Sequence, residues 1–473
     1  MGKAAREFAD FLAAAGQTWW QILPIGPTSY GDSPYQSFST FAGNPYLIDL
    51  DDLAGEGLLK SHEYKSLNWG DDPHRVDYGL LHENRFPVLR KAVRRLHLAL
   101  PEDYGAFLSA NESWLGDYAL FMALKEANHG RPWQEWEEPL RCREEKAMEK
   151  ARVKYARDLR FWEGVQYLFF HQWEGLKRYA NDRGIRFIGD LPIYVSADSA
   201  DVWARPEQFQ LDGELRPVEV AGVPPDGFTA DGQLWGNPLF DWERMAQDGY
   251  AWWIERFRRQ NGFYDVLRID HFRGFDEYFA VPYGETTARN GYWKKGPGIA
   301  LFRAVEARLG KQNIIAEDLG YLNDSVRQML SDSGFPGMKV LQFAFDSRGG
   351  ESDYLPHKYV PNCVCYVGTH DNDTAVGWLE SISPEDRQFA VDYLKLTVGE
   401  GGAWGLMRSA LATVADTVIL TAQDLLGLGS EARMNEPSTL GKNWQWRAGE
   451  GVFTPELAHK LRRETALYYR LPR

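Results

Sequence analysis

Cysteine is nearly absent from this sequence. Only Cys142, Cys363 and Cys365 occur in 473 residues, which is too few for the disulfide framework of a small secreted domain. Cys363 and Cys365 are two residues apart, so a strand would carry both on one face, and this spacing is not that of a zinc finger. We therefore expect reduced thiols in a cytoplasmic protein.

Excess positive charge and long apolar runs are also lacking. Lysine and arginine number 53 against 67 aspartates and glutamates, a net charge of −14. Such a chain repels phosphate backbones, so we expect neither nucleic acid nor an anionic membrane as a partner. No uninterrupted run of 18 apolar residues occurs, which argues against a membrane span. Residues 1–16 have the pattern of an amphipathic helix rather than of a signal peptide.

Aromatic residues, in contrast, are abundant. They make up 14% of the chain and include 18 tryptophans. A large hydrophobic core would explain part of this content. Sugar binding would explain it equally well, because aromatic rings stack on the apolar faces of pyranose rings.

Seven short apolar runs recur along the chain, and amphipathic helical patterns lie between most of them. The runs cover residues 19–23, 186–188, 266–269, 314–316, 340–345, 364–367 and 418–420. Runs of this kind are typical of parallel strands that are covered on both faces. Strand and helix in repeated alternation predict an α/β fold, and the chain length favours a (β/α)8 TIM barrel over an open sheet.

Two stretches interrupt this alternation. Residues 28–155 begin with a loop rich in glycine, serine, proline and tyrosine, and then show mostly helical patterns, the last over 135–159. We predict that they form a helical insertion after the second barrel strand, between the start of the barrel at 1–27 and its remainder at 156–473. Residues 203–242 are rich in glycine and proline, and we expect them to form a surface loop that covers the barrel mouth as a lid.

Three strand ends carry carboxylates, and the carboxyl ends of barrel strands build the active site. Arg268 and Asp270 share one strand face. A neighbouring cation keeps a carboxylate ionised, which suits a nucleophile, although a structural ion pair is an alternative. Glu317 and Asp318 must point in opposite directions, so at most one enters the barrel. Asp318 would serve as the N-cap of the next helix.

The third strand end carries His370 and Asp371. A metal site is the competing hypothesis, but none of the ten histidines forms a His-x-His pair, so we expect no metal. Two carboxylates that flank a scissile bond are the working parts of a glycosidase, and a third acid holds a sugar hydroxyl as charge develops. Three acids at strand ends, among aromatic-rich loops, favour carbohydrate chemistry.

Longer motifs make the chain recognisable. They cover residues 31–46 (GDSPYQSFSTFAGNPY), 189–195 (GDLPIYV), 222–226 (GVPPD), 235–238 (WGNP), 433–435 (RMN) and 441–447 (GKNWQWR). With these motifs the sequence closely resembles 4-α-glucanotransferases of the amylomaltase, or disproportionating enzyme, family, which belong to the α-amylase clan. The resemblance extends over essentially the whole chain.

The resemblance implies a role for each matching residue. Asp270 matches the nucleophile, Glu317 the acid/base and Asp371 the transition-state stabiliser. The residues that match sugar contacts are Arg268 and His370 around the cleaved bond, Asp190, Ser33 and Tyr35 on the donor side, Trp235 and Asn237 on the lid loop, and Asn435 on a second rim loop. Core packing remains an alternative for Tyr35 and Trp235, and loop capping for Ser33 and Asn435.

The implied reaction is the retaining transfer of an α-1,4-glucan segment from a donor maltodextrin to the 4-OH of an acceptor glucose or glucan. Maltooligosaccharides and α-glucans are then the substrates, and no cofactor is implied. An α-1,4-glucan hydrolase on the same barrel, and an inactive glucan-binding protein, are the alternatives.

The strand count departs from the family pattern. Seven strand signals are present, and a closed barrel of this class has eight. In the family the chain opens with a strand ahead of the helix that begins here near Gly2. We expect that this first barrel strand is missing from the sequence, and that its place lies between the strands near 19–23 and 418–420.

Overall fold

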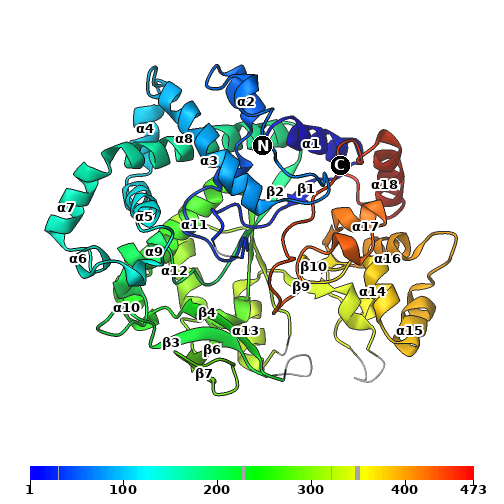
Figure 1. The fold of residues 1–473 in the computed structure, drawn as a ribbon. Helices are drawn as coiled ribbons and strands as arrows, with labels where there is room; N and C mark the ends of the chain where they lie inside the picture. The colour runs from blue at the N-terminus through cyan, green and yellow to red at the C-terminus, as the bar shows by residue number, and fades with distance from the viewer. Residues whose placement is uncertain (30, 226–229, 321, 347–351, 473) are drawn as a thin grey trace.

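A parallel sheet forms the centre of the molecule (Figure 1). The structure is a computed structural model that describes every residue except 30, 226–229, 321, 347–351 and 473. The sheet has the order β1-β2-β5-β8-β9-β10-β11, and every neighbouring pair is parallel. Its strands are β1 (Trp19–Gln21), β2 (Arg186–Leu191), β5 (Val266–Ile269), β8 (Ile314–Ala316), β9 (Gly337–Val340), β10 (Cys363–Tyr366) and β11 (Thr417–Ile419).

The predicted (β/α)8-type architecture is confirmed. Within the described residues the sheet has seven strands, and β1 and β11 are its two edges, as the strand count predicts. Ile188, Ile315, Val340 and Val364 are among the residues that pack together as a separate apolar cluster on the inner face. The side chains on the opposite face pack against the surrounding helices.

One predicted strand is displaced. We expected a strand over 340–345, but β9 ends at Val340 and residues Leu341–Ala344 form a 3₁₀-helix. Gln342 fixes this turn, because its amide Nε2 donates to the carbonyl oxygen of Asp373 at 2.9 Å. A buried strand and a buried helical turn are both apolar throughout, so periodicity alone does not distinguish them.

The segment between β1 and β2 is mostly helical, as expected. It contains α2 (Leu50–Gly55), α3 (Tyr78–Leu96), α4 (Tyr104–Ala110), α5 (Leu115–Ala127), α6 (Glu138–Arg141), α7 (Glu145–Lys154) and α8 (Ala156–Asn181). The helix predicted over 135–159 is broken into α6, α7 and the start of α8. Arg143, between α6 and α7, has a φ of 54°, which no right-handed helix accommodates. The domain boundaries at 28 and 155 stay predictions.

A second, antiparallel sheet lies below the barrel in Figure 1. Its order is β4-β3-β6-β7, with β3 (Glu219–Val223), β4 (Gln233–Pro238), β6 (Glu277–Pro282) and β7 (Tyr292–Lys295). The prediction of a surface loop over 203–242 is therefore wrong, since β3 and β4 both lie within it. A Cβ on Gly222 would lie 2.6 Å from the carbonyl oxygen of Gln233, so glycine here permits close strand pairing rather than a loop.

The remaining helices surround the barrel, and the two chain ends lie close together (Figure 1). They are α1 (Lys3–Ala14), α9 (Ala200–Ala204), α10 (Trp242–Gln247), α11 (Ala251–Phe263), α12 (Ile299–Leu309), α13 (Asp324–Ser333), α14 (Ala375–Ser381), α15 (Pro384–Leu394), α16 (Gly402–Leu411), α17 (Ala422–Leu426) and α18 (Pro455–Leu467). Helix α1 packs on α18, and Phe8 of α1 contacts Phe453, which precedes α18, with ring centroids 4.7 Å apart.

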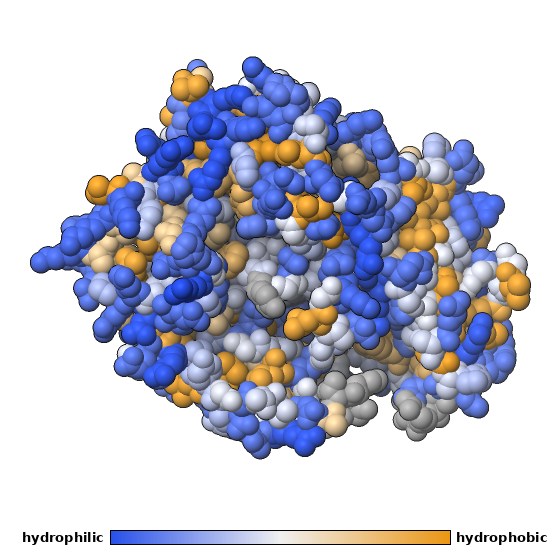
Figure 2. Space-filling view, viewed as in Figure 1, coloured by the Kyte–Doolittle hydropathy of each residue, from blue (hydrophilic) through white to orange (hydrophobic). Residues whose placement is uncertain are grey.

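The surface in the view of Figure 2 is mainly hydrophilic, with scattered hydrophobic residues. In the part of the chain that the structure describes, no helix combines the length and the apolar character that a bilayer crossing requires.

Candidate active site

Arg268 lies at the centre of the candidate site, near the carboxyl end of β5. Its Nη1 lies 2.7 Å from both carboxylate oxygens of Asp190 and 3.3 Å from Oδ1 of Asp270. Its Nη2 lies 3.3 Å from Oε2 of Glu317. The side chain of Arg268 is only 4% exposed. One buried guanidinium therefore holds three carboxylates from three neighbouring strands.

The register of the sheet explains this convergence. Asp190 on β2 is paired directly with Arg268 on β5, and Arg268 with Ile315 on β8. Paired residues in neighbouring strands point to the same face, and residues two apart on a strand share that face. Asp190, Arg268, Asp270 and Glu317 therefore all project inward at the barrel mouth.

Asp270 and Glu317 are an electrostatically coupled pair. Burial, and then the negative charge of Glu317, raises the pKa of Asp270 well above its usual value, while Arg268 opposes the shift. Burial also raises the pKa of Glu317, against Arg268 and against a hydrogen bond with the Asp270 carboxyl group.

The two acids differ in exposure but not in their distance from the cation. The Glu317 side chain is 16% exposed against 25% for Asp270, and both carboxylates lie 3.3 Å from Arg268. As expected, Arg268 favours the ionised form of Asp270, but burial and the neighbouring acid outweigh the guanidinium, so the pKa of Asp270 is raised and not lowered.

Glu317 and Asp318 do point in opposite directions, but Asp318 is not a helix cap. The N-cap of α13 is Asn323, whose side chain accepts a hydrogen bond from the backbone N–H of Val326. Asp318 is buried and its Oδ1 accepts a hydrogen bond from the backbone N–H of Met338 at 2.6 Å. It therefore attaches the loop after β8 to β9.

Asp371 lies on the loop after β10 and is held differently. Asn435 donates from Nδ2 to its Oδ1 at 2.6 Å, and Arg433 donates to its backbone carbonyl at 2.8 Å. Nε2 of His370 lies 3.4 Å from the same Oδ1. Burial lowers the pKa of His370, so this ring is neutral at ordinary pH. The Asp371 side chain is 47% exposed, far more than the other two acids.

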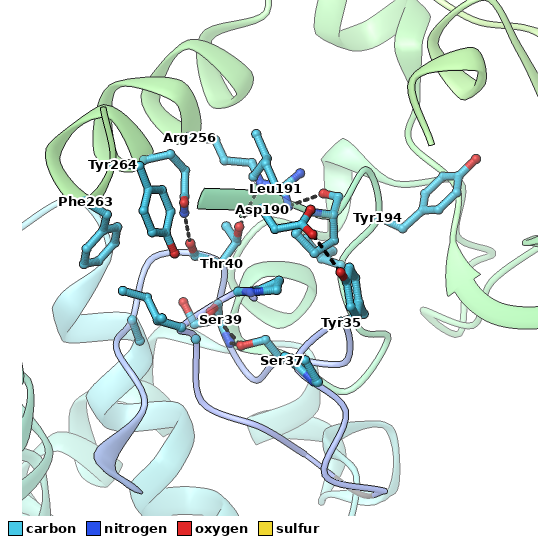
Figure 3. Close-up of a pocket in the computed structure, with 18 residues that line it drawn as sticks. Tyr35, Ser37, Ser39, Thr40, Asp190, Leu191, Tyr194, Arg256, Phe263 and Tyr264 are labelled. Carbon is cyan, nitrogen blue, oxygen red and sulfur yellow. Dashed lines mark hydrogen bonds between the residues drawn. The ribbon is translucent and has the colours of Figure 1, made fainter. Parts of the chain in front are cut away.

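Tyr35 connects the loop over residues 31–46 to this cluster. Its hydroxyl donates to Oδ2 of Asp190 at 2.7 Å, as Figure 3 shows. Its ring stacks on His370, with centroids 5.2 Å apart. Oγ of Ser33 accepts a hydrogen bond from the backbone N–H of Tyr35 at 3.2 Å, so Ser33 shapes the turn that presents Tyr35. The cavity behind Tyr35 has a volume of about 40 Å³, room for a water rather than for a sugar ring.

Trp235 and Asn237 lie on β4, not on a loop. The indole of Trp235 meets the ring of His271 edge to face, with centroids 4.9 Å apart. Asn237 is buried and its amide is already bonded, because Nδ2 donates to the carbonyl of Val195 at 2.8 Å and Oδ1 accepts from Gln36 at 3.3 Å. Asn237 therefore joins β4 to the loops beside it.

A rim strap, defined here as residues 433–447, crosses from the loop after α17 to the start of α3. The backbone N–H of Val76 donates to the carbonyl of Gln445 at 2.7 Å, and the hydroxyl of Tyr78 donates to the carbonyl of Trp444 at 2.6 Å. The ring centroid of Trp444 lies 5.8 Å from those of His370 and Tyr35. The strap thus places Trp444 beside the acids.

Sequence reasoning gave no role to His271 or Trp444, although both lie in segments that it singled out. Their signal was adjacency: His271 directly follows Asp270, and Trp444 is the central residue of the 441–447 motif. Among the described residues, no group of three or more histidine, cysteine, aspartate or glutamate side chains is arranged to hold a metal ion.

Comparisons with known proteins show which family this chain resembles. A family model described as 4-alpha-glucanotransferase matches residues 1–451. The 4-alpha-glucanotransferase of Clostridium butyricum is 49% identical over 99% of this chain and 96% of that protein, and that of Thermus thermophilus is 47% identical over 98% and 93%. The structure of amylomaltase from Streptococcus agalactiae in complex with acarbose superposes with a TM-score of 0.97 at 43% identity, covering 100% of this chain and 96% of that one.

Proposed function

Because the chain belongs to the 4-alpha-glucanotransferase family, we propose that its three acids transfer an α-1,4-glucan segment between maltooligosaccharides by a retaining mechanism. The observation that carries this proposal is the single buried guanidinium of Arg268, which holds Asp190, Asp270 and Glu317 together at the barrel mouth. A carboxylate nucleophile with a second carboxyl group nearby as its acid/base is the arrangement that a covalent glycosyl-enzyme requires.

In the first step, an ionised Asp270 attacks the anomeric carbon of the donor. The bond between that carbon and the glycosidic oxygen breaks, and Glu317 gives its proton to the departing glucan. Burial raises the pKa of both carboxyl groups, which favours one shared proton on the pair. The glycosidic oxygen of a bound donor accepts a hydrogen bond from Glu317, and this favours the state in which Asp270 is the ionised partner.

In the second step, Glu317 takes the proton of the acceptor 4-OH, the acceptor oxygen bonds to the anomeric carbon, and the Asp270 carboxylate leaves. Asp371 holds sugar hydroxyls as positive charge develops at that carbon. Its greater exposure and its neutral donor, Asn435, suit a group that must exchange its partner for a sugar. Arg268, His370 and Tyr35 fix the positions of these carboxylates.

Transfer, rather than hydrolysis, requires that a sugar reaches the intermediate before water does. Trp235, in contact with His271, and Trp444, beside His370, place aromatic surface next to residues that adjoin the acids. We further propose that the protein works in the cytoplasm. The three free thiols of Cys142, Cys363 and Cys365 support this location.

The test is incubation of the wild-type protein with maltotriose. We expect a ladder of longer maltooligosaccharides with released glucose, and no net gain of reducing ends. A gain of reducing ends without a ladder would instead identify an α-1,4-glucan hydrolase. If neither wild type nor Asp270→Asn turns maltotriose over, while both bind it equally, the protein is an inactive glucan binder.

A further inference from the structure

His271, the residue after Asp270, adopts a backbone conformation that is uncommon for residues other than glycine. Its φ and ψ are 50° and 49°, in the left-handed region. Non-glycine residues seldom occupy this region, and those that do at functional sites are held there by their surroundings. The contacts around His271 must therefore stabilise this conformation.

The consequence is a hydrogen bond to the acid/base candidate. The backbone N–H of His271 donates to Oε2 of Glu317 at 2.5 Å. Two further bonds fix the same residue: the N–H of Phe272 donates to the carbonyl of Glu317 at 3.0 Å, and the N–H of Glu317 donates to the carbonyl of Ile269 at 3.0 Å. The turn after β5 thus holds both the backbone and the carboxylate of Glu317.

The imidazole ring packs against two neighbours of the turn. It lies edge to face with Trp235, with centroids 4.9 Å apart. It also lies against Gly274, where an added Cβ would approach Cδ1 of Ile193 to 2.8 Å and Cδ2 of His271 to 2.9 Å. Burial, and then the charge of Arg273, lowers the pKa of His271 to about 3, so the ring is neutral.

We infer that His271 is a positioning residue for the proposed transfer reaction: the left-handed turn that it forms, beside Trp235 and Gly274, presents the N–H that fixes the Glu317 carboxylate. The inference rests on the proposed function for its kinetic consequence. The ring itself exchanges no proton. What the residue supplies is one N–H at a defined position.

This hydrogen bond should affect the pH dependence of kcat/KM. A donor to the ionised carboxylate lowers the pKa of Glu317. Activity requires one proton on the pair and is lost as pH rises through the upper pKa, so removal of this donor moves the basic limb of kcat/KM to higher pH. The other groups that act on Glu317 are left unchanged by substitution at 271: Arg268, Asp270, Asp371, Tyr354 and Tyr366.

The experiment compares variants that differ in their tolerance of the left-handed region. Glycine adopts it freely and a β-branched residue does not. For His271→Val we expect kcat/KM for maltotriose to fall about 10- to 100-fold, as for loss of a hydrogen bond to a charged group, with the basic limb about one pH unit higher. For His271→Gly we expect a loss of about threefold or less and an unshifted limb.

A substitution at Gly274, a neighbour of the His271 ring, perturbs the same turn. Gly274→Ala pushes the ring of His271 and should move the basic limb in the same direction as His271→Val, so it carries the test if the valine variant does not fold. In a His271→Gly background the same alanine should move the limb no further. Thermal unfolding of each variant separates a loss of folded protein from a change in the folded site.

A titration that needs no turnover distinguishes this inference from the proposed function. Carboxyl ¹³C NMR of glutamate-labelled protein, with Glu317→Gln to assign the resonance, should show a higher Glu317 midpoint in His271→Val and a wild-type midpoint in His271→Gly. Equal effects of glycine and valine, in rate or in midpoint, would overturn the inference. So would a wild-type midpoint in both valine and Gly274→Ala variants, whatever the wild-type protein does to maltotriose.

Discussion

Arg268 and Arg256 are both deeply buried, and they are held in opposite ways. Arg268 faces three carboxylates, and its pKa is raised well above the usual value because Asp190 and Glu317 outweigh the cost of burial. Arg256 on α11 faces mostly neutral oxygens: it donates to Thr40 Oγ1 at 2.8 Å and to the carbonyls of Ile193 and Pro192 at 3.1 and 2.6 Å. Burial lowers its pKa to about 9.

The difference separates a chemical role from a mechanical one. Carboxylates around Arg268 are left with part of their charge unbalanced, because one cation cannot neutralise three acids. Oxygens around Arg256 carry no net charge, so the guanidinium only ties the loop after β2 to the loop over residues 31–46, as Figure 3 shows for Thr40. Two buried arginines thus have different tests, one kinetic and one thermodynamic.

The largest expected effect is that of Arg268→Met on activity. Without the cation Asp190, Asp270 and Glu317 hold additional protons, the nucleophile is no longer ionised, and the maltotriose transfer rate should fall at least about 10³-fold. Arg268→Lys keeps the charge but not the planar fork, so it should restore only a small part of the rate. A methionine variant within tenfold of wild type would show that Arg268, like Arg256, is only structural.

Arg256→Met should act on stability instead. Three oxygens lose their donor, and we expect the free energy of unfolding in urea to fall by about 2–4 kcal/mol. The transfer rate per folded molecule should stay within about threefold of wild type. Arg258→Met is the matched control on the same helix: Arg258 is exposed and paired with Glu255, and its loss should cost less than about 0.5 kcal/mol.

Asp201 is the acid whose charge acts on Arg256. It makes the stability of this cluster depend on pH. Burial raises its pKa to about 6, with only partial compensation from the N–H of Thr40 and from Arg256. The folded state therefore binds a proton that the unfolded state releases near pH 4. The contribution of Asp201 to the free energy of unfolding is fully present below pH 4 and is lost as pH rises through about 6.

Asp201→Asn should remove this loss. Relative to wild type, the variant should gain roughly 2–3 kcal/mol of unfolding free energy between pH 4 and pH 7. Urea unfolding at both pH values measures the change. A stability difference between variant and wild type that does not vary with pH would mean that Asp201 is ionised throughout.

The smallest expected effect concerns the third acid, which belongs to neither arginine. Asn435→Ala removes the donor from the Asp371 carboxylate, and we expect kcat for maltotriose to fall about tenfold. Both limbs of the kcat/KM profile should stay in place, because Asp270 and Glu317 are untouched. A shift of either limb would show that Asp371 titrates together with the buried pair.

The parallel strands were predictable because each is a short apolar run, and the inward direction of Asp270 and Glu317 follows from strand alternation alone. Register was not predictable. That Asp190 rather than Asp270 is the closest partner of Arg268 depends on the pairing of β2 with β5. Asp318 likewise bonds to Met338 because β9 passes beside it, and nothing local in the sequence distinguishes this from a helix cap.

The second sheet escaped prediction for a related reason. Strand β3 pairs with β6 through Glu219 and Pro282, residues more than 60 positions apart. The segment around it is rich in glycine and proline, which in isolation indicates turns. Only the structure shows that the backbone of Gln233 lies too close to Gly222 for a side chain, so that strand pairing requires glycine here.

The rim strap has a consequence for the order in which the molecule folds. It joins Val76 to Gln445 and His74 to Arg447, pairs that are about 370 residues apart in the chain. Closing so long a loop costs conformational entropy before the contact can form. We therefore expect the strap to dock after the barrel, α3 and α17 are in place. Trp444 and Asn435 reach His370 and Asp371 only at that moment. The newly made protein should therefore have its sheet-borne acids assembled before its third acid is held, and it should reach full activity only once the strap has docked.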